Sequence, residues 1–120
     1  MAANHYDLKQ LIYLIKDNKD FDANLILDEG CGIDTEDPKP LLKSLNYIIN
    51  YLKQITQSPL EISLDLRDKN YLLSLMAYSD VADLPDISTQ LDETLKDYNA
   101  TKDVVHENGK YIQIKVSFIK

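Results

Sequence analysis

The hydrophobic positions near the start of the chain predict a helix followed by a strand. In residues 4–17 apolar side chains recur every three or four positions, at Leu8, Leu11, Ile12 and Ile15, which is typical of an amphipathic helix. Asn4 stands where the cap of this helix is expected. Residues 23–27 are apolar except for Asn24, which predicts a short buried strand. Residues 28–40 hold two of the three glycines and two of the four prolines, so they predict a loop.

The middle of the chain changes from a helical to an alternating pattern. Residues 40–56 predict a long amphipathic helix whose apolar stripe consists of Leu41, Leu45, Ile48, Leu52 and Ile55. Pro40 suits the first turn of a helix, and the dipeptide Ser58-Pro59 predicts its end. From residue 60 to residue 67 leucine and isoleucine alternate with polar residues, as in a strand with one face in water.

A returning strand and a third helix follow. A short turn at residues 68–70 leads into a more apolar strand over 71–78, so the two strands form a hairpin. The polar loop over 80–86 precedes a third amphipathic helix, which Asp86 or Ser88 is placed to cap. We also expect several tyrosines to gather at one seam between helix and sheet, where this residue packs well. They are Tyr47, Tyr51, Tyr71 and Tyr78.

The end of the chain predicts a second hairpin, with arms over residues 103–106 and 111–119 joined by the turn dipeptide Asn108-Gly109. The expected order of elements is therefore α-β-α-β-β-α-β-β. Two of the strands show one polar face each, so helices need to cover only one side of the sheet. We expect a single domain over residues 1–120, an α+β two-layer sandwich with a mixed, mostly antiparallel sheet and its helices on one face.

Charge and composition narrow the classes of function. Thirteen Lys and Arg residues face twenty Asp and Glu residues, which leaves a net charge of −7. Such a surface repels nucleic acid and anionic membranes and suits a basic protein partner. The single cysteine, Cys31, excludes an internal disulfide, and no signal peptide or long apolar run is recognised, so we expect a cytoplasmic protein. The acidic residues between 28 and 37 lack the ligand order of a calcium loop, and we expect no metal or cofactor.

The helix over residues 40–56 also carries a motif. Two asparagines, Asn46 and Asn50, lie four positions apart and therefore on one side of the helix. With Lys53 and Thr56 they follow the pattern N-L-L-x-N-A-x-K-y-T of sensor histidine kinases, with a one-residue slip at its end. Residues 24–120 as a whole resemble the ATP-binding fold shared by histidine kinases, gyrase-type topoisomerases, ninety-kilodalton heat-shock chaperones and mismatch-repair proteins, the GHKL superfamily.

The resemblance implies which residues would hold a nucleotide. In that family the asparagine aligned with Asn50 binds the magnesium ion that bridges the triphosphate, and an amide oxygen suits this hard cation. The family also has a D-x-G-x-G motif at the place where Asp80 stands here. Both glycines are missing, and no glycine lies between Gly32 and Gly109, so the close approach of backbone to nucleotide is lost. We therefore expect that nucleotide binding is lost, with Asn46, Asn50 and Asp80 as the site only if it is retained.

Three further residues are weaker candidates. Residues 28–33 spell D-x-G-x-G-I, but before the asparagine helix instead of after it. We interpret this segment as a plain loop, and a permuted site that combines Asp28 with Asn50 is the alternative. His5, on the first predicted helix, and His106, at the second hairpin, are weak candidates for a phosphoacceptor histidine. Two isolated histidines and one cysteine form neither a zinc site nor a nucleophile–base pair.

These expectations indicate a non-catalytic protein-interaction or signalling module and no enzyme. By resemblance, degenerate members of this fold act as docking or phosphotransfer partners in bacterial signalling, and we include a homodimer among the expected forms. Two alternatives remain open. One is an ATP- and magnesium-binding domain that uses Asn50 with Asp80 or Asp28. The other is an acidic inhibitor or immunity-type protein that neutralises a basic partner.

Overall fold

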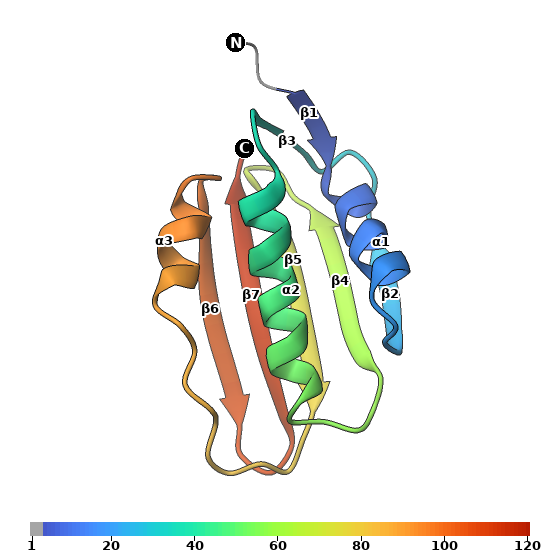
Figure 1. Cartoon of the computed structure of the whole chain (residues 1–120), viewed down its shortest axis with the longest axis vertical. Coiled ribbons are helices and arrows are strands. Elements are labelled where there is room, and N and C mark those ends of the chain that lie inside the picture. Colours follow the sequence, from blue (N-terminus) through green and yellow to red (C-terminus); the bar gives the residue numbers. More distant parts are fainter. Residues whose placement is uncertain (1–3) are drawn as a thin grey trace.

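A mixed sheet with helices on one of its faces builds the fold. The computed structural model describes residues 4–120. Its five-stranded sheet has the order β2-β4-β5-β7-β6, with bounds Ala23–Leu27, Leu60–Leu66, Asn70–Tyr78, Tyr111–Ile119 and Ala100–Glu107. The helices α1 (Leu8–Asn18), α2 (Lys39–Lys53) and α3 (Gln90–Lys96) lie together in front of this sheet (Figure 1). The predicted α+β sandwich with two layers is therefore confirmed.

The pairing of the strands follows from the length of the connections between them. β4 and β5 are joined by a tight turn and pair antiparallel, as do β6 and β7, and β5 pairs antiparallel with β7. β2 and β4 are instead parallel, with Leu25 opposite Ile62. A parallel pair needs a long crossover, and the chain makes it through α2, which crosses the helical face of the sheet (Figure 1).

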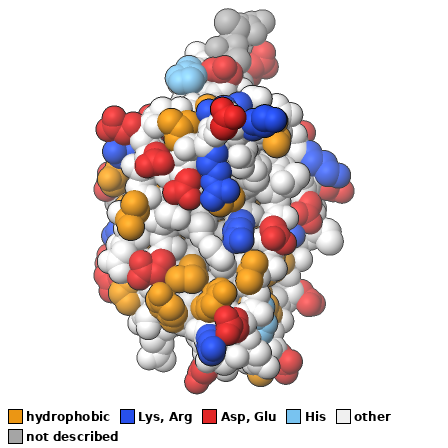
Figure 2. All heavy atoms as spheres, turned by 180° about the vertical axis from the view of Figure 1, so that it is seen from behind, with side chains coloured by type: hydrophobic (Ala, Val, Ile, Leu, Met, Phe, Trp, Pro, Cys, Tyr) orange, Lys and Arg blue, Asp and Glu red, His pale blue; other side chains and the backbone are white. Residues whose placement is uncertain are grey.

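The core lies between the helices and the inner face of the sheet. The alternation along β7 turns four apolar side chains inward, Ile112, Ile114, Val116 and Phe118, all at most 1% exposed. The stripe on α2 meets them with Leu41, Leu45, Ile48 and Leu52, which are equally buried. The other face of the sheet is open and carries a mixture of apolar and charged side chains (Figure 2). The sheet therefore has one dry and one wet face, as its alternating strands predict.

The beginning of the chain differs from the prediction. Residues Asn4–Asp7 form a strand, β1, which pairs antiparallel with β3 (Gly32–Thr35), a strand inside the predicted loop. Helix α1 starts only at Leu8, and its cap is Asp7, whose carboxylate accepts a hydrogen bond from Lys9 N at 2.9 Å. The expected cap Asn4 is thus wrong. Both strands are four residues long and of mixed polarity, so neither has a periodic signal of its own.

Three further boundaries are corrected by the structure. Strand β2 is an edge strand, and Ile26 is 74% exposed on the open face, whereas the sequence predicts a strand buried on both faces. Strand β6 begins at Ala100, three residues before the predicted arm. Helix α3 begins only at Gln90, after Thr89, which makes no side-chain cap, and the expected cap Ser88 accepts a hydrogen bond from Gln90 N through its Oγ atom. Within residues 4–120 no helix is long and apolar enough to cross a membrane.

Candidate functional site

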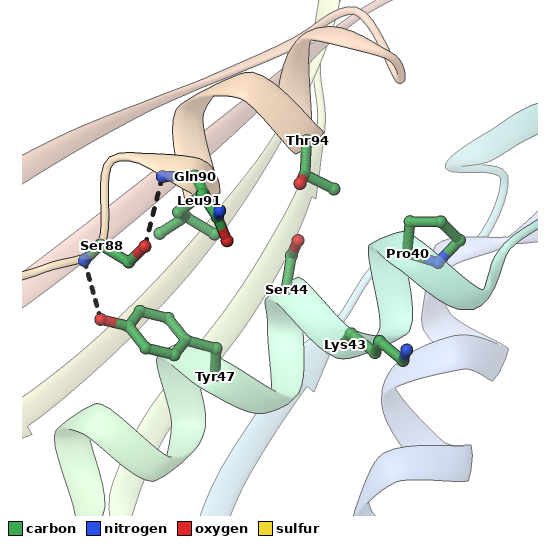
Figure 3. Close-up of a pocket in the computed structure, with 8 residues that line it drawn as sticks. All are labelled: Pro40, Lys43, Ser44, Tyr47, Ser88, Gln90, Leu91 and Thr94. Atoms are coloured by element: carbon green, nitrogen blue, oxygen red, sulfur yellow. Dashed lines mark hydrogen bonds between the residues drawn. The ribbon is translucent and has the colours of Figure 1, made fainter.

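A cavity between α2 and α3 is the candidate site. It has a volume of about 470 Å³ and is bounded by one wall from each helix and by the segment that precedes α3. Figure 3 shows the side chains that line it. They are Pro40, Lys43, Ser44, Tyr47, Ser88, Gln90, Leu91 and Thr94. Cavities of a few hundred Å³ with an apolar lining and a few polar groups are the usual form of binding sites in proteins.

One polar side chain of this cavity is buried without using its hydrogen-bonding group. Ser44 is only 7% exposed, and its hydroxyl is directed from α2 toward Thr94 of α3 (Figure 3). None of the side-chain hydrogen bonds formed within the described part of the chain involves this hydroxyl. Asn46 Oδ1, not the Ser44 oxygen, is the fully buried side-chain atom without a partner among the described residues, so the Ser44 hydroxyl opens on the cavity and is available to a polar group of a guest molecule.

Two tyrosines of α2 hold the segment between β5 and α3 against the helix. The hydroxyl of Tyr51 donates to the carbonyl oxygen of Pro85 at 2.7 Å. The hydroxyl of Tyr47 accepts a hydrogen bond from Ser88 N at 2.9 Å, and Ser88 Oγ accepts one from Gln90 N at 3.2 Å (Figure 3). Burial raises the pKa of Tyr51 above its ordinary value, so this phenol remains a hydrogen-bond donor at neutral pH. Residues 79–89 are thereby fixed at one end of the cavity.

A third tyrosine caps the start of α2. Pro38 precedes this helix and offers no side-chain cap. The carboxylate of Asp37 accepts a hydrogen bond from Lys39 N at 3.0 Å. The hydroxyl of Tyr98 accepts one from Leu41 N at 3.2 Å and donates to the carbonyl oxygen of Asp37 at 2.8 Å. The first backbone N–H groups of a helix have no partner within the helix. Tyr98, which follows the end of α3, supplies a partner for one of them. The α2 wall of the cavity is therefore anchored to the α3 wall through this residue.

The asparagines of the sequence motif do not line the cavity. Asn46 is half-buried, and its Oδ1 atom has no hydrogen-bond partner among the described residues. Asn50 is exposed. The helix turns Tyr47 and Tyr51 toward residues 79–89, so the two asparagines lie on a neighbouring side of α2. The motif positions are real features of α2, but the structure does not bring them together around the α2–α3 cavity.

The two aspartates proposed with Asn50 lie elsewhere. Asp80 is exposed and lines a different cavity, which also contains Thr56 and Lys110. The carboxylate of Asp28 accepts a hydrogen bond from Leu66 N at 2.8 Å and so continues the pairing of β2 with β4. Gly30 has a φ of +86°, a conformation that favours glycine. These contacts give the segment around Asp28 a local role at the edge of the sheet.

The two histidines are separate from this cavity and from each other. His5 lies on β1, where the sequence predicts a helix, and its Nδ1 atom is 2.8 Å from Asp34 Oδ1. Both side chains of this pair are largely exposed. His106 lies on β6, and its Nε2 donates to the carbonyl oxygen of Val81 at 3.2 Å. His106 therefore fixes the same 79–89 segment that the α2 tyrosines hold.

The cysteine and the acidic side chains of the described residues do not gather into one reactive or metal-binding site. Cys31 is buried, and burial, with a smaller contribution from Asp28, raises the pKa of its thiol above the ordinary value. A thiol in such surroundings is a poor nucleophile. Among residues 4–120 no group of three or more His, Cys, Asp or Glu side chains is placed to hold a metal ion. The four tyrosines also divide, because Tyr71 and Tyr78 lie near opposite ends of β5.

Comparison with solved structures identifies the fold. The chain superposes over 98% of its length on the Acinetobacter baumannii histidine kinase AdeS, with a TM-score of 0.72, 13% identity and 66% of that chain covered. It matches the catalytic domain of the histidine kinase ThkA over 100% of its length and 97% of that chain, with a TM-score of 0.70 and 12% identity. The histidine kinase domain of the E. coli osmosensor EnvZ gives a TM-score of 0.76 at 8% identity, with 99% and 89% covered.

The chain therefore has the fold of a histidine kinase catalytic domain. The predicted resemblance is confirmed at this level, and these structural neighbours are domains of enzymes. No family model matches the sequence, and no curated protein matches it. The sequence did not single out Ser44, and it placed the α2 tyrosines only at a seam between helix and sheet, whereas the structure places Ser44 and Tyr47 at the cavity. Tyr47 and Tyr51 have the spacing of one helix face, which was the available signal in the sequence, whereas Ser44 had none.

Proposed function

We propose that this domain is a non-catalytic protein-interaction module of a cytoplasmic signalling system, and that it has lost nucleotide binding. The observation that carries the proposal is the attachment of residues 79–89 to α2 through Tyr51 with Pro85 and Tyr47 with Ser88. A segment held at both points by buried or half-buried phenols leaves little freedom to rearrange around a triphosphate. The fold that this chain shares with histidine kinase domains supports a place in signalling.

The chemistry of the cavity also supports this proposal. Phosphate groups are commonly bound by backbone N–H groups that a glycine-rich turn leaves accessible. No glycine lies between Gly32 and Gly109, so the segment before α3 has side chains at every position. Lys43 is the one cation among the residues that line the cavity. Asn50 and Asp80, which the sequence names as part of a retained nucleotide site, lie outside it.

Titration with magnesium-ATP tests the proposal directly. A ligand that binds only the folded state stabilises it, by about 2.7 kcal/mol when its concentration is a hundred times Kd. We expect millimolar ATP with magnesium to leave the melting temperature unchanged and to produce no binding heat in calorimetry. Saturable binding would overturn the proposal. If the variant Asn50→Ala then abolished that binding, the ATP-binding alternative with Asn50 would replace it.

A loosened variant makes this test stricter. Tyr47→Phe combined with Tyr51→Phe removes both hydrogen bonds to residues 79–89 and changes no charge. Tyr13→Phe is the matched control, because Tyr13 lies on the exposed side of α1. We expect neither variant to gain ATP binding, since neither restores the missing glycines or brings Asn50 to the cavity. Binding by the double variant alone would show that the tied segment conceals an intact nucleotide site.

A further inference from the structure

A segment with a strong excess of acidic residues lies beside the α2–α3 cavity. Residues 79–98 contain six acidic residues and one lysine, so this segment accounts for five of the seven net negative charges. Asp92 is paired with Lys102 at 3.1 Å. The carboxylates of Asp86, Glu93 and Asp97 are exposed and form no ion pair with any residue of the described chain.

These free carboxylates border the cavity on its α3 side. Gln90 and Thr94 face the cavity from α3 (Figure 3). Glu93 follows Gln90 by three positions, which places it next to this face on the solvent side of α3, and Asp97 is the C-cap residue directly after this helix, where it also lines a second cavity with Tyr98. Asp86 lies near Tyr51, where its charge contributes to the raised pKa of that phenol. The rim is therefore acidic along α3 and at the end where the 79–89 segment enters.

We propose that the α2–α3 cavity docks an arginine side chain from a basic helix of a protein partner. This inference rests on the proposed function and names the site and the partner chemistry of that interaction. The stem of an arginine would lie against Leu91 and the ring of Tyr47, and its guanidinium would donate to the unused hydroxyl of Ser44. Arginine suits this lining better than lysine because its planar group has several donors and stacks on aromatic rings.

Charge complementarity selects a basic partner over the other possible occupants. A second copy of the chain brings the same acidic rim, so the two copies repel each other at this surface. An anionic guest meets the same repulsion from Glu93 and Asp97. The cation Lys43 lies on the α2 wall beside Pro40 (Figure 3). A cationic guest is repelled by Lys43 and attracted by the acidic rim. Removing this lysine should therefore strengthen the binding of a cationic guest and weaken the binding of an anionic one.

The test uses the full chain and synthetic helical probes. One alanine-based peptide of about 15 residues carries leucines on one face and arginines beside them. A second peptide has glutamate in place of every arginine. We expect the arginine peptide to bind in fluorescence anisotropy, and its affinity to fall by about tenfold or more between about 50 mM and 500 mM salt. We expect amide shifts in NMR to map to α2 and α3.

Charge variants assign the site. Glu93→Lys combined with Asp97→Lys reverses the rim, and we expect affinity for the arginine peptide to fall by about tenfold or more. Asp103→Lys with Asp65→Lys is the matched control, because these aspartates lie on the open face of the sheet, and it should change affinity by less than about threefold. Lys43→Ala should bind the arginine peptide about twofold tighter.

Several outcomes would overturn the inference. They are equal binding of the glutamate peptide, no binding of the arginine peptide at low salt, shifts confined to the open face of the sheet, and weaker binding by Lys43→Ala. Changes in the NMR amide shifts at the α2–α3 cavity that grow with protein concentration in the absence of peptide would identify a second copy of the chain as the occupant. If the arginine peptide does not bind and ATP does not bind either, the arginine site is refuted and the proposed function stands. If ATP binds, the proposed function itself is refuted.

Discussion

Replacement of Tyr98 by phenylalanine isolates the contribution of the residue that caps α2. The substitution keeps the ring and removes only the hydroxyl, which accepts from Leu41 N at 3.2 Å and donates to Asp37 O at 2.8 Å. Leu41 is fully buried, so its N–H group loses its partner, whereas the carbonyl oxygen of Asp37 lies at the surface, where water replaces the hydroxyl. A buried hydrogen bond contributes about 1 kcal/mol, and an orphaned buried donor costs about 1–3 kcal/mol. We therefore expect the free energy of unfolding to fall by about 2 kcal/mol.

Urea unfolding followed by circular dichroism measures this change. With an unfolding entropy of about 2.1 cal/mol/K per residue over 120 residues, a loss of 2 kcal/mol corresponds to a fall of about 8 °C in Tm. The slope of the urea transition should stay the same, because the surface exposed on unfolding is unchanged. Tyr13→Phe, on an exposed face of α1, should lie within about 0.5 kcal/mol of the parent. A similarly small change for Tyr98→Phe would refute the role of Tyr98 as a cap.

Three further outcomes follow from the same structure. Burial raises the pKa of both Tyr51 and Tyr98 above the ordinary value of 10. Their contribution to stability is therefore complete below pH 10 and is lost as the pH rises beyond it. Replacing both by Phe should make the free energy of unfolding, measured by urea titration, decline less at alkaline pH. Because burial raises the pKa of Cys31, a thiol reagent should label it only at the rate at which the structure opens, and immediate labelling of the native chain would contradict its burial. Asn46→Leu should stabilise the fold by about 1 kcal/mol by removing an unpartnered buried oxygen, whereas destabilisation would show that the amide has a partner in solution.

The strands and helices with long periodic patterns were predictable from the sequence. Alternation along residues 60–66 and 111–119 depends only on which face of a strand is buried, and that is a local property. The stripe on α2 was recognised for the same reason. Strands β1 and β3 were missed because each four-residue strand is stabilised chiefly by the other, across the whole of α1 and β2. Part of the cap of α2 is local, because Asp37 Oδ1 accepts from Lys39 N, but the partner of Leu41 N is Tyr98, 57 residues away, and no local pattern indicates that contact.

The candidate site was predicted less completely than the fold. The spacing of Asn46 and Asn50 correctly places them on one side of a helix. It does not predict which neighbouring element that side of the helix faces. The rotation of α2 follows from its buried stripe, and the position of α3 follows from tertiary packing that a single sequence does not specify. Together these place Tyr47 and Ser44 at the cavity. The role of Tyr51 likewise depends on the path of residues 79–89, which the sequence describes only as a polar loop.

The parallel pairing of β2 with β4 divides the molecule into two parts that differ in their local free energy of opening. Strands β4 to β7 form two hairpins joined through a central antiparallel ladder, whereas residues 4–27 are attached at the sheet edge after a long crossover. Amide protons of β2 and α1 should consequently exchange with deuterated solvent sooner than those of β5 and β7, through partial openings that leave the hairpins intact. Such an opening removes the α1 side chains that pack beside α2 in the core, and it leaves in place the Tyr98 hydrogen bonds that join the end of α3 to the start of α2.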